Sequence, residues 1–371
     1  MNYELFYTFA PMNSRILITG ASGFIGSFIV EEALNRGFDT WAAVRKSSSR
    51  DFLKDKRIHL IELNLSSEEQ LKQQLKDIQF DYVVHAAGVT KCLHKEDFFR
   101  INTEGTKNLV RALLDLKMPL KRFVYISSLS IMGAIREEQP YREIRERDKA
   151  QPNTAYGKSK LEAEQWLDKI SEEVKGKSEK FLDLMVQNDQ KSSGKGTGEE
   201  FPYVILRPTG VYGPRERDYF MIAKSIKAHT DFAVGFKQQD ITFVYVTDVV
   251  QAIFLALEKG ENGRRYFLSD GEVYQSSTFS DLIRKELGNP WWIRITAPIW
   301  LLRVITFCGE YIGHLTGKVT ALNNDKYHIM KQRNWRCDIT PAQQELGYEP
   351  QVKLEEGVHK SIDWYKKNNW L

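Results

Sequence analysis

A glycine-rich turn between an apolar strand and a helix constrains the fold most. Residues 15–19 (Arg-Ile-Leu-Ile-Thr) predict a buried strand, and residues 24–36 predict a helix. Between them, Gly20, Gly23 and Gly26 allow a tight turn. Such a turn lets backbone N–H groups approach a pyrophosphate at the positive end of the helix. Strand, turn and helix in this order predict a dinucleotide-binding unit.

Apolar strand candidates alternate with helical segments over the following residues. We expect further strands at 40–44, 58–61, 81–85, 122–127 and 203–207. Because strands that alternate with helices usually pair in parallel, the pattern predicts an α/β fold of the Rossmann type with a doubly wound parallel sheet. After residue 207 the pattern becomes irregular and rich in aromatic residues, which suits a smaller C-terminal substrate-binding subdomain.

These patterns divide the chain into two units. We assign residues 12–207 to an NAD(P)-binding Rossmann domain, with Met12 a candidate start, and expect residues 241–260 to return to it. Residues 208–240 and 261–371 then form the substrate-binding subdomain. Residues 171–200 are rich in Lys, Glu, Ser and Gly, so we expect a mobile insertion whose second half is a solvated loop. A segment that docks a partner is the alternative.

Composition narrows the classes of partner. The 53 basic and 49 acidic residues nearly balance, so we expect no nucleic-acid partner. Cys92, Cys308 and Cys337 lack the spacing of a metal site and are too few for a disulfide framework. We therefore expect no metal and a cytoplasmic location. The N-terminus also lacks the basic head and apolar stretch of a secretory signal.

The end of the second predicted strand indicates which cofactor is bound. An NAD-selective site normally places an acidic residue there, against the ribose hydroxyls, but this chain has Arg45. Its guanidinium suits a 2′-phosphate, and Lys46 and Arg50 lie nearby in the sequence. We therefore expect a preference for NADP(H), with NAD(H) as the alternative. Solvated loop cations would give the same pattern.

The fourth strand ends in small residues. Ala86, Ala87 and Gly88 would let the backbone lie close to the cofactor. His85 precedes them and resembles a catalytic base, but we interpret it as a packed histidine at the strand end because a better acid-base residue exists elsewhere.

A phenol and an ammonium lie four residues apart in Tyr156-Gly-Lys-Ser-Lys160, so on a helix they project from one face. For a tyrosine to act as a base near neutrality, its pKa must fall by about three from its usual value near 10. Lys160 and an oxidised nicotinamide would supply the positive field. Ser128 follows an apolar strand, at the sheet edge where ligands bind, and would hydrogen-bond the substrate oxygen.

Four motifs together resemble the extended short-chain dehydrogenase/reductase superfamily, also called the NAD-dependent epimerase/dehydratase superfamily. They are Thr19-Gly-Ala-Ser-Gly-Phe-Ile-Gly26, Ser127-Ser128, Tyr156-x-x-x-Lys160 and Arg207-Pro-Thr-Gly-Val-Tyr-Gly-Pro214. The similarity runs from about residue 14 to about 260, and more loosely through Leu346-Gly-Tyr-Glu-Pro350 to the end.

This resemblance implies a role for each matched residue. Tyr156 is expected to be the general acid/base, Lys160 to bind the nicotinamide ribose, and Ser128 to orient the carbonyl, with Ser130 as a secondary candidate. Asn102 matches a family position near the active site. The expected cofactor contacts are Gly20, Ser22, Gly23, Phe24, Ile25, Gly26, Arg45, Asn64, Leu65, Ala86, Ala87, Gly88, Tyr156, Lys160 and Pro208. At Asn64 the family usually has Asp against the adenine. The resemblance also implies a homodimer built on the helices that carry Asn102 and Tyr156.

Two expected diphosphate contacts are missing. Members that act on nucleotide sugars usually read Arg-x-x-Asn where this chain has Arg207-Pro-Thr-Gly210, and they carry Arg where it has Ile241. Arg215 and Arg217 are the candidate replacements. The chain is therefore nearer the 3β-hydroxysteroid dehydrogenase and dihydroflavonol reductase branch. This predicts hydride transfer to a bulky apolar ketone, sterol-like or a long-chain lipid intermediate. A nucleotide-sugar epimerase or dehydratase and a cofactor-binding scaffold without catalysis are the alternatives.

Residues 291–317 need a large apolar partner. In the predicted helix after Pro298, Arg303, Thr306, Glu310 and His314 form a narrow polar stripe on an otherwise apolar surface. The protein core is the default partner, and a second subunit, an apolar substrate and peripheral contact with a membrane surface remain open. The charges and Pro298 argue against a transmembrane span.

Overall fold

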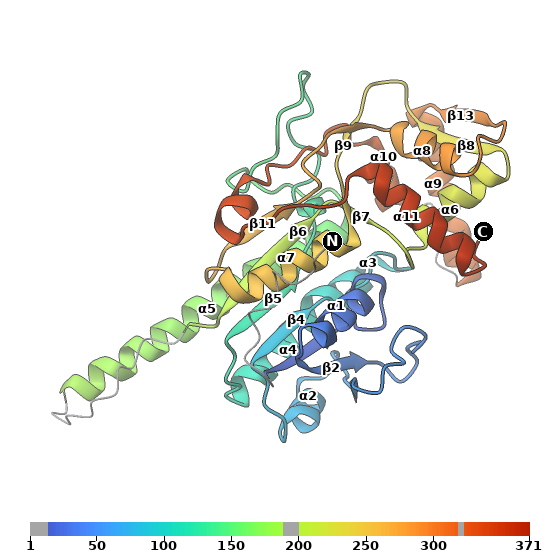
Figure 1. Ribbon diagram of the computed structural model, residues 1–371. Coiled ribbons are helices and arrows are strands. Elements are labelled where there is room, and N and C mark those ends of the chain that lie inside the picture. The colour runs from blue at the N-terminus through green and yellow to red at the C-terminus, as the bar shows by residue number, and fades with distance from the viewer. Residues whose placement is uncertain (1–13, 188–199, 318–322) are drawn as a thin grey trace.

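The computed structural model describes residues 14–187, 200–317 and 323–371, so Met12 lies outside them. A seven-stranded parallel sheet in the order β3-β2-β1-β4-β5-β6-β11 forms the centre (Figure 1). Its strands are β1 (Arg15–Thr19), β2 (Asp39–Val44), β3 (His59–Glu62), β4 (Tyr82–His85), β5 (Arg122–Ile126), β6 (Tyr203–Pro208) and β11 (Arg265–Leu268). The strand order reverses between β1 and β4, so the predicted doubly wound Rossmann sheet is confirmed.

Helices cover both faces of this sheet because alternate residues of each strand point to opposite sides. Ile16 and Ile18 join a core that includes residues of α1 and α7, whereas Leu17 between them joins a second core with residues of α2, α4 and α5. These helices are α1 (Phe24–Asn35), α2 (Glu68–Leu75), α4 (Gly105–Asp115), α5 (Ala155–Gln187) and α7 (Val246–Lys259). The short helix α3 (Lys95–Phe98) leads through a π-helical turn into α4.

A smaller subdomain lies at the carboxyl edge of the sheet (Figure 1). Its elements are β7 (Gly210–Tyr212), α6 (Asp218–Lys227), β8 (Thr230–Val234), β9 (Asp240–Ile241), β10 (Phe243–Tyr245), β12 (Tyr274–Gln275), α8 (Thr278–Glu286), β13 (Ile293–Ala297), α9 (Ile299–Thr316), α10 (Asn324–Lys331) and α11 (Leu354–Lys367). Edge-to-face contacts of Tyr212 with Phe243 and Phe279 join β7, β10 and α8 in a third, aromatic core.

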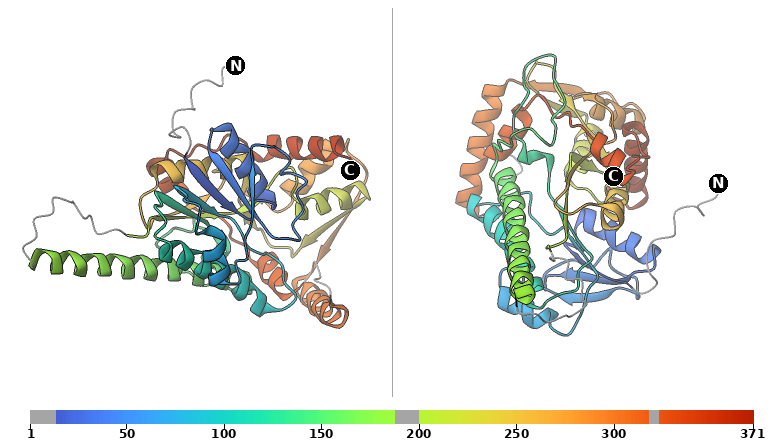
Figure 2. Two further views of the ribbon diagram at one scale, coloured as in Figure 1. Left: turned by 90° about the horizontal axis from the view of Figure 1, so that it is seen from below. Right: turned by 90° about the vertical axis from the view of Figure 1, so that its left-hand side faces the viewer.

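Two of the expected boundaries require correction. Strand β11 lies in the subdomain range 261–371 but pairs with β6 in the central sheet. The sequence of β11 is a short apolar run. Such a run does not indicate whether the strand belongs to the central sheet or to the subdomain. The expected insertion at 171–200 is helical as far as Gln187, since α5 continues without a break and extends from the body (Figure 2). Residues 188–199 lie outside the described residues.

The apolar face of α9 does not pack into the protein core, contrary to the default expectation. Phe307 and Leu315 are 71% and 70% exposed. In both views of Figure 2 the helix lies at the outer edge of the molecule. No helix among the described residues is long and apolar enough to cross a membrane.

A buried ion pair connects α5 to the sheet. The Arg207 guanidinium on β6 donates to Glu164 on α5 at 2.5 and 3.2 Å, and both side chains are almost fully buried. The guanidinium also lies over the Phe267 ring of β11, 5.5 Å from its centre. Arg207, which the sequence placed in a family motif, therefore ties the helix to two strands.

Removing one member of this pair should destabilise the fold. For Arg207→Met we expect the free energy of unfolding to fall by about 3 kcal/mol, because the Glu164 carboxylate stays buried without its partner. The double variant Arg207→Met/Glu164→Leu should recover most of the loss. The exposed pair of Lys360 and Glu356 is the control, and breaking it should cost about 0.5 kcal/mol or less. Urea unfolding followed by circular dichroism measures these differences. A double variant as unstable as the single one would contradict this account.

Candidate active site

The glycine-rich turn brings the ends of β1 and β4 together. Gly20 has φ +71°, and a Cβ there would stand 2.7 Å from the backbone of Ala86. A Cβ on Gly26 would stand 2.0 Å from the carbonyl oxygen of Gly20. No side chain larger than hydrogen fits at either position, so both glycines are required by the backbone packing itself.

The N-terminus of α1 suits an anionic ligand. Gly23 is its N-cap and provides no side-chain hydrogen bond, and the first turn carries no acidic residue. Ser22, Phe24 and Ile25 are partly buried beside this end of the helix. Free N–H groups and the positive end of the helix dipole are what a pyrophosphate binds, so the residues present fit a dinucleotide.

His85 is a structural residue in this arrangement. Its ring is fully buried and hydrogen-bonds Thr19 at 2.7 Å on β1 and Thr106 at 2.9 Å on α4. Burial lowers its pKa to about 3, and the nearby Lys160 ammonium adds to this. A neutral imidazole thus joins β4 to its neighbours, as the packed-histidine interpretation expects.

Asn102 holds the segment after β4 in place. It lies in the π-helical turn Phe99–Glu104 and is fully buried. Its Oδ1 accepts from the Val89 N–H at 2.8 Å, and its Nδ2 donates to Val89 O at 3.1 Å and Ser159 Oγ at 3.0 Å. Asn102 therefore links the backbone beside Gly88 to α5, the helix that carries Tyr156. Its role is to position these two segments.

The Lys160 ammonium is buried beneath Gly88. Its Nζ donates to Ile126 O at 2.8 Å, lies 4.7 Å from the centre of the Tyr125 ring, and would be 3.3 Å from a Cβ on Gly88. Burial lowers the pKa of Lys160 to about 8, although Glu164 opposes the shift. This ammonium has more protons to donate than the one carbonyl accepts, which suits the hydroxyls of a ribose.

The Tyr156 phenol faces Ser128. A hydrogen bond from Ser128 lowers the pKa of Tyr156, but burial outweighs it and raises that pKa to about 12. The sequence predicts that Lys160 and an oxidised nicotinamide together lower this pKa, whereas among the protein's own groups burial is the larger effect. Lys160 directs its charge to Ile126 and the Tyr125 ring, so the desolvation of the phenol dominates.

The remaining expected contacts lie along the same edge of the sheet. Arg45 is exposed at the end of β2. Pro208 is buried at the end of β6. The Asn64 side chain is taken up by local hydrogen bonds, to Gln70 Oε1 at 2.8 Å and from the Ser66 N–H at 3.1 Å. Ala86 and Ala87 are partly buried, as is Leu65, whose carbonyl accepts from Asn108. Ser130 donates its backbone N–H to Ser128 Oγ.

The sequence does not reveal two residues that contact Tyr156, Asp325 and Phe98. Asp325 of α10 accepts from the backbone N–H groups of Ala155 and Tyr156 at 3.1 and 3.2 Å, so it caps the helix that carries the phenol. Phe98 packs edge-on against the Tyr156 ring, with centroids 6.2 Å apart. No local pattern could reveal either contact, because the partners are far apart in the sequence.

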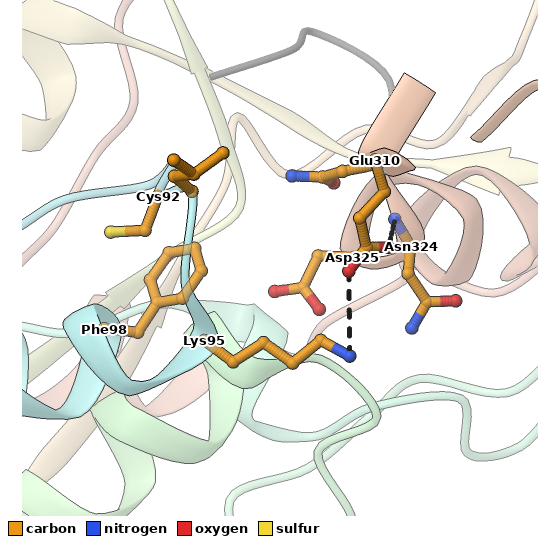
Figure 3. A pocket seen from close by; sticks show the side chains of 8 residues that line it. Cys92, Lys95, Phe98, Glu310, Asn324 and Asp325 are labelled. Carbon is orange, nitrogen blue, oxygen red and sulfur yellow. Dashed lines mark hydrogen bonds and ion pairs between the residues drawn. The ribbon is translucent and has the colours of Figure 1, made fainter. Parts of the chain in front are cut away.

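A pocket opens beside Tyr156, between the segment after β4 and the subdomain (Figure 3). Cys92, Lys95 and Phe98 line one side, and Glu310 of α9 and Asp325 of α10 line the other. With its solvent-open part it encloses about 370 Å³. Phe98 packs against the Tyr156 ring and Asp325 accepts from the Tyr156 backbone N–H, so two lining residues of the pocket contact Tyr156.

The fold and this site match a known family. Residues 16–269 match the model of the NAD dependent epimerase/dehydratase family. The chain belongs to that family. It is an NAD(P)-dependent oxidoreductase of the extended short-chain dehydrogenase type. Its named relatives are enzymes, which favours catalysis over a scaffold role.

Relatives within the family act on two kinds of substrate. Sterol-4-alpha-carboxylate 3-dehydrogenase (decarboxylating) from Candida albicans is 22% identical over 95% of this chain and 98% of its own length. Human dTDP-D-glucose 4,6-dehydratase is 25% identical over 96% and 91%. The solved UDP-glucose 4-epimerase of Thermotoga maritima superposes with a TM-score of 0.71 at 21% identity, covering 96% of this chain and 99% of that one.

Burial of the Lys160 charge should cost stability. Because its pKa in the folded protein is about 8 and that of an unburied lysine is 10.5, Lys160→Met should raise the free energy of unfolding at pH 7. We expect a gain of about 2 kcal/mol, from about 3 for the charge less about 1 for the lost hydrogen bond to Ile126. The gain should be complete below pH 8 and fade as pH rises to 10.5, where the folded wild type has already lost its proton.

Thermal unfolding at pH 7 and pH 9.5 checks this sign. Lys158→Met, at an exposed position of the same helix, is the matched control and should change the midpoint little. A Lys160→Met protein that melts below wild type at pH 7 would show that the ammonium stabilises the fold.

Proposed function

We propose that the enzyme uses NADPH to reduce the carbonyl group of a bulky apolar ketone, sterol-like or long-chain, and oxidises the alcohol in the reverse direction. The convergence of Tyr156, Ser128 and Lys160 at the carboxyl edge of the sheet carries this proposal. The protein's own groups keep the phenol protonated near neutral pH. Ketone reduction needs a proton donor in that state.

The proposed reduction assigns a role to each of these residues. The dihydronicotinamide of a dinucleotide held at the N-terminus of α1 would supply the hydride that the carbonyl carbon accepts. Ser128 donates a hydrogen bond to the carbonyl oxygen, and Tyr156 transfers its phenolic proton to that oxygen as the alcohol forms. Lys160 binds the nicotinamide ribose and stabilises the phenolate with its positive charge until solvent returns a proton. Phe98 and Asp325 hold the phenol and its helix in position.

The charges around the pocket favour an apolar substrate over a sugar diphosphate. Glu310 and Asp325 face the pocket, and Lys95 is the one cation among the described residues that line it, so the two carboxylates would repel a diphosphate. Arg215, a candidate replacement for the missing diphosphate contacts, is committed elsewhere. It donates to Ser27 at 2.9 Å and Glu31 at 2.6 Å on α1.

The preference for NADP(H) rests on Arg45. Its side chain is exposed at the end of β2, where the adenosine ribose of a dinucleotide would lie, and no ion pair involves it among the described residues. Arg50, by contrast, lies 3.6 Å from Glu62. Arg45 is therefore more available to a 2′-phosphate than Arg50 is, and its guanidinium suits a phosphate better than the ammonium of the neighbouring, also exposed Lys46.

Tyr156→Phe tests the reaction. We expect kcat for NADPH-dependent reduction of an apolar cyclic ketone to fall roughly 1000-fold, because the proton donor is lost while packing against Phe98 stays. The loss of NADPH absorbance measures the rate, and Tyr82→Phe, at a buried tyrosine of β4 away from Ser128, is the control. Undiminished turnover would refute the role of Tyr156. Conversion of UDP- or dTDP-sugars without net NADPH loss would show that the substrate is a sugar nucleotide and not an apolar ketone.

Arg45→Asp tests the cofactor. The ratio of kcat/KM for NADPH to that for NADH should fall roughly 100-fold, because the carboxylate repels a 2′-phosphate and accepts from ribose hydroxyls. Arg57→Asp, at an exposed arginine paired with Asp55 in the same loop region, should leave the ratio nearly unchanged. An unchanged ratio in Arg45→Asp would assign the preference to another residue.

A further inference from the structure

Helix α9 turns two polar side chains, Thr306 and Glu310, toward the protein. Leu302 and Thr306 are 3% and 2% exposed, and the Thr306 hydroxyl donates to Leu302 O at 3.0 Å within the helix. Glu310, one turn further, accepts from the Asn324 N–H at 3.3 Å and lies 3.9 Å from Lys95 (Figure 3). Part of the polar stripe seen in the sequence thus faces the protein. A surface helix usually turns its apolar side to the protein and its polar side to solvent, so α9 has the opposite orientation.

The opposite side of α9 is apolar and exposed along the helix. We call it the outer face, and it comprises Trp300, Val304, Phe307, Tyr311 and Leu315, each 52–71% exposed. Their spacing of four, three, four and four residues places them in one stripe. Contiguous exposed apolar surface of this kind marks an interaction site.

A second apolar surface adjoins the start of α9. Strands β8 and β13 pair in parallel with Phe232 opposite Ile295, so these two side chains and Ile293 share one face of the ribbon. They are 46–65% exposed. The Gly235 N–H donates to Ala297 O at 2.9 Å, which brings Phe236, 79% exposed, beside the segment that begins α9.

The charges around these surfaces are positive. Arg303 is exposed on α9, and Lys237 follows the exposed Phe236. Neither forms an ion pair among the residues that the structure describes. Glu310, the sole acidic residue of α9, faces inward. An anionic surface would therefore meet cations and no carboxylate of this helix.

We propose that the outer face of α9 and the adjoining β8–β13 surface dock on a lipid bilayer with anionic headgroups. Trp300 and Tyr311 suit the headgroup region, because each has an apolar ring and one polar group, and Phe307 and Leu315 would enter the acyl boundary. Arg303 and Lys237 would bind lipid phosphates. The inner side of α9 lines the pocket beside Tyr156, so the bilayer would lie about one helix diameter, roughly 10 Å, from that pocket.

Docking supplies the substrate class of the proposed reaction. If the enzyme reduces apolar ketones, as proposed above, a bilayer at α9 would deliver a ketone that is almost absent from water. A second copy of the chain fits the charges less well. Cations directed toward the same surface of a twin would repel each other, and lysine is depleted at protein interfaces.

Vesicle binding tests the docking without any substrate. The full-length wild type should sediment with vesicles of equal parts phosphatidylcholine and phosphatidylglycerol. Phe307→Glu/Leu315→Glu should weaken binding at least about tenfold, because both charges would enter the acyl boundary. Arg303→Glu should weaken binding to these vesicles more than to pure phosphatidylcholine. Leu60→Glu, at an exposed apolar residue on the edge strand β3, is the matched control and should bind as wild type does. Thermal midpoints of all variants check folding.

Other outcomes would overturn the proposal. Wild type that binds neither vesicle, or a double variant that binds as well as wild type, refutes docking through α9. A wild-type dimer that Phe307→Glu/Leu315→Glu makes monomeric assigns the face to a second copy. The failure of docking and the failure of the proposed reaction are distinguishable. A water-soluble ketone should be reduced equally by wild type and the double variant, whereas a vesicle-borne long-chain ketone should be reduced faster by wild type.

Discussion

The burial of the Lys160 ammonium is the interaction on which the site depends. Its charge is held by one carbonyl, that of Ile126, and by the Tyr125 ring. The ammonium can donate further hydrogen bonds, and its Nζ lies beside Gly88. The protein thus keeps a costly buried charge, with a pKa of about 8, where a ligand can satisfy it. The fold therefore gives up stability to keep this charge buried, which suits the proposed role of Lys160 in binding the cofactor.

Helix α5 transmits this arrangement to the rest of the molecule. Glu164 binds it to Arg207 in the sheet, and Asp325 of the subdomain caps its first turn. Asn102, through Ser159, joins it to the segment that follows β4. The position of Tyr156 is therefore set by contacts from both units of the protein.

The proposed substrate class rests on residues of the subdomain. Family membership leaves both apolar ketones and sugar nucleotides open, since relatives of both kinds are about equally similar to this chain. The carboxylates of Glu310 and Asp325 in the pocket, and the commitment of Arg215 to α1, argue for an uncharged substrate. The same helix α9 presents one side to the pocket and an apolar side to the exterior.

The sequence by itself determined the elements that depend on nearby residues. The strands of the Rossmann half were predicted to within one residue at each end, because short apolar runs and glycine spacing are local. It also placed Tyr156 and Lys160 on one helix. Only the tertiary structure showed that β11 joins the sheet, that Asp325 caps α5, that burial raises the pKa of Tyr156, and that α9 turns its apolar side outward. These properties arise from desolvation and from contacts between distant segments, and neither leaves a local pattern.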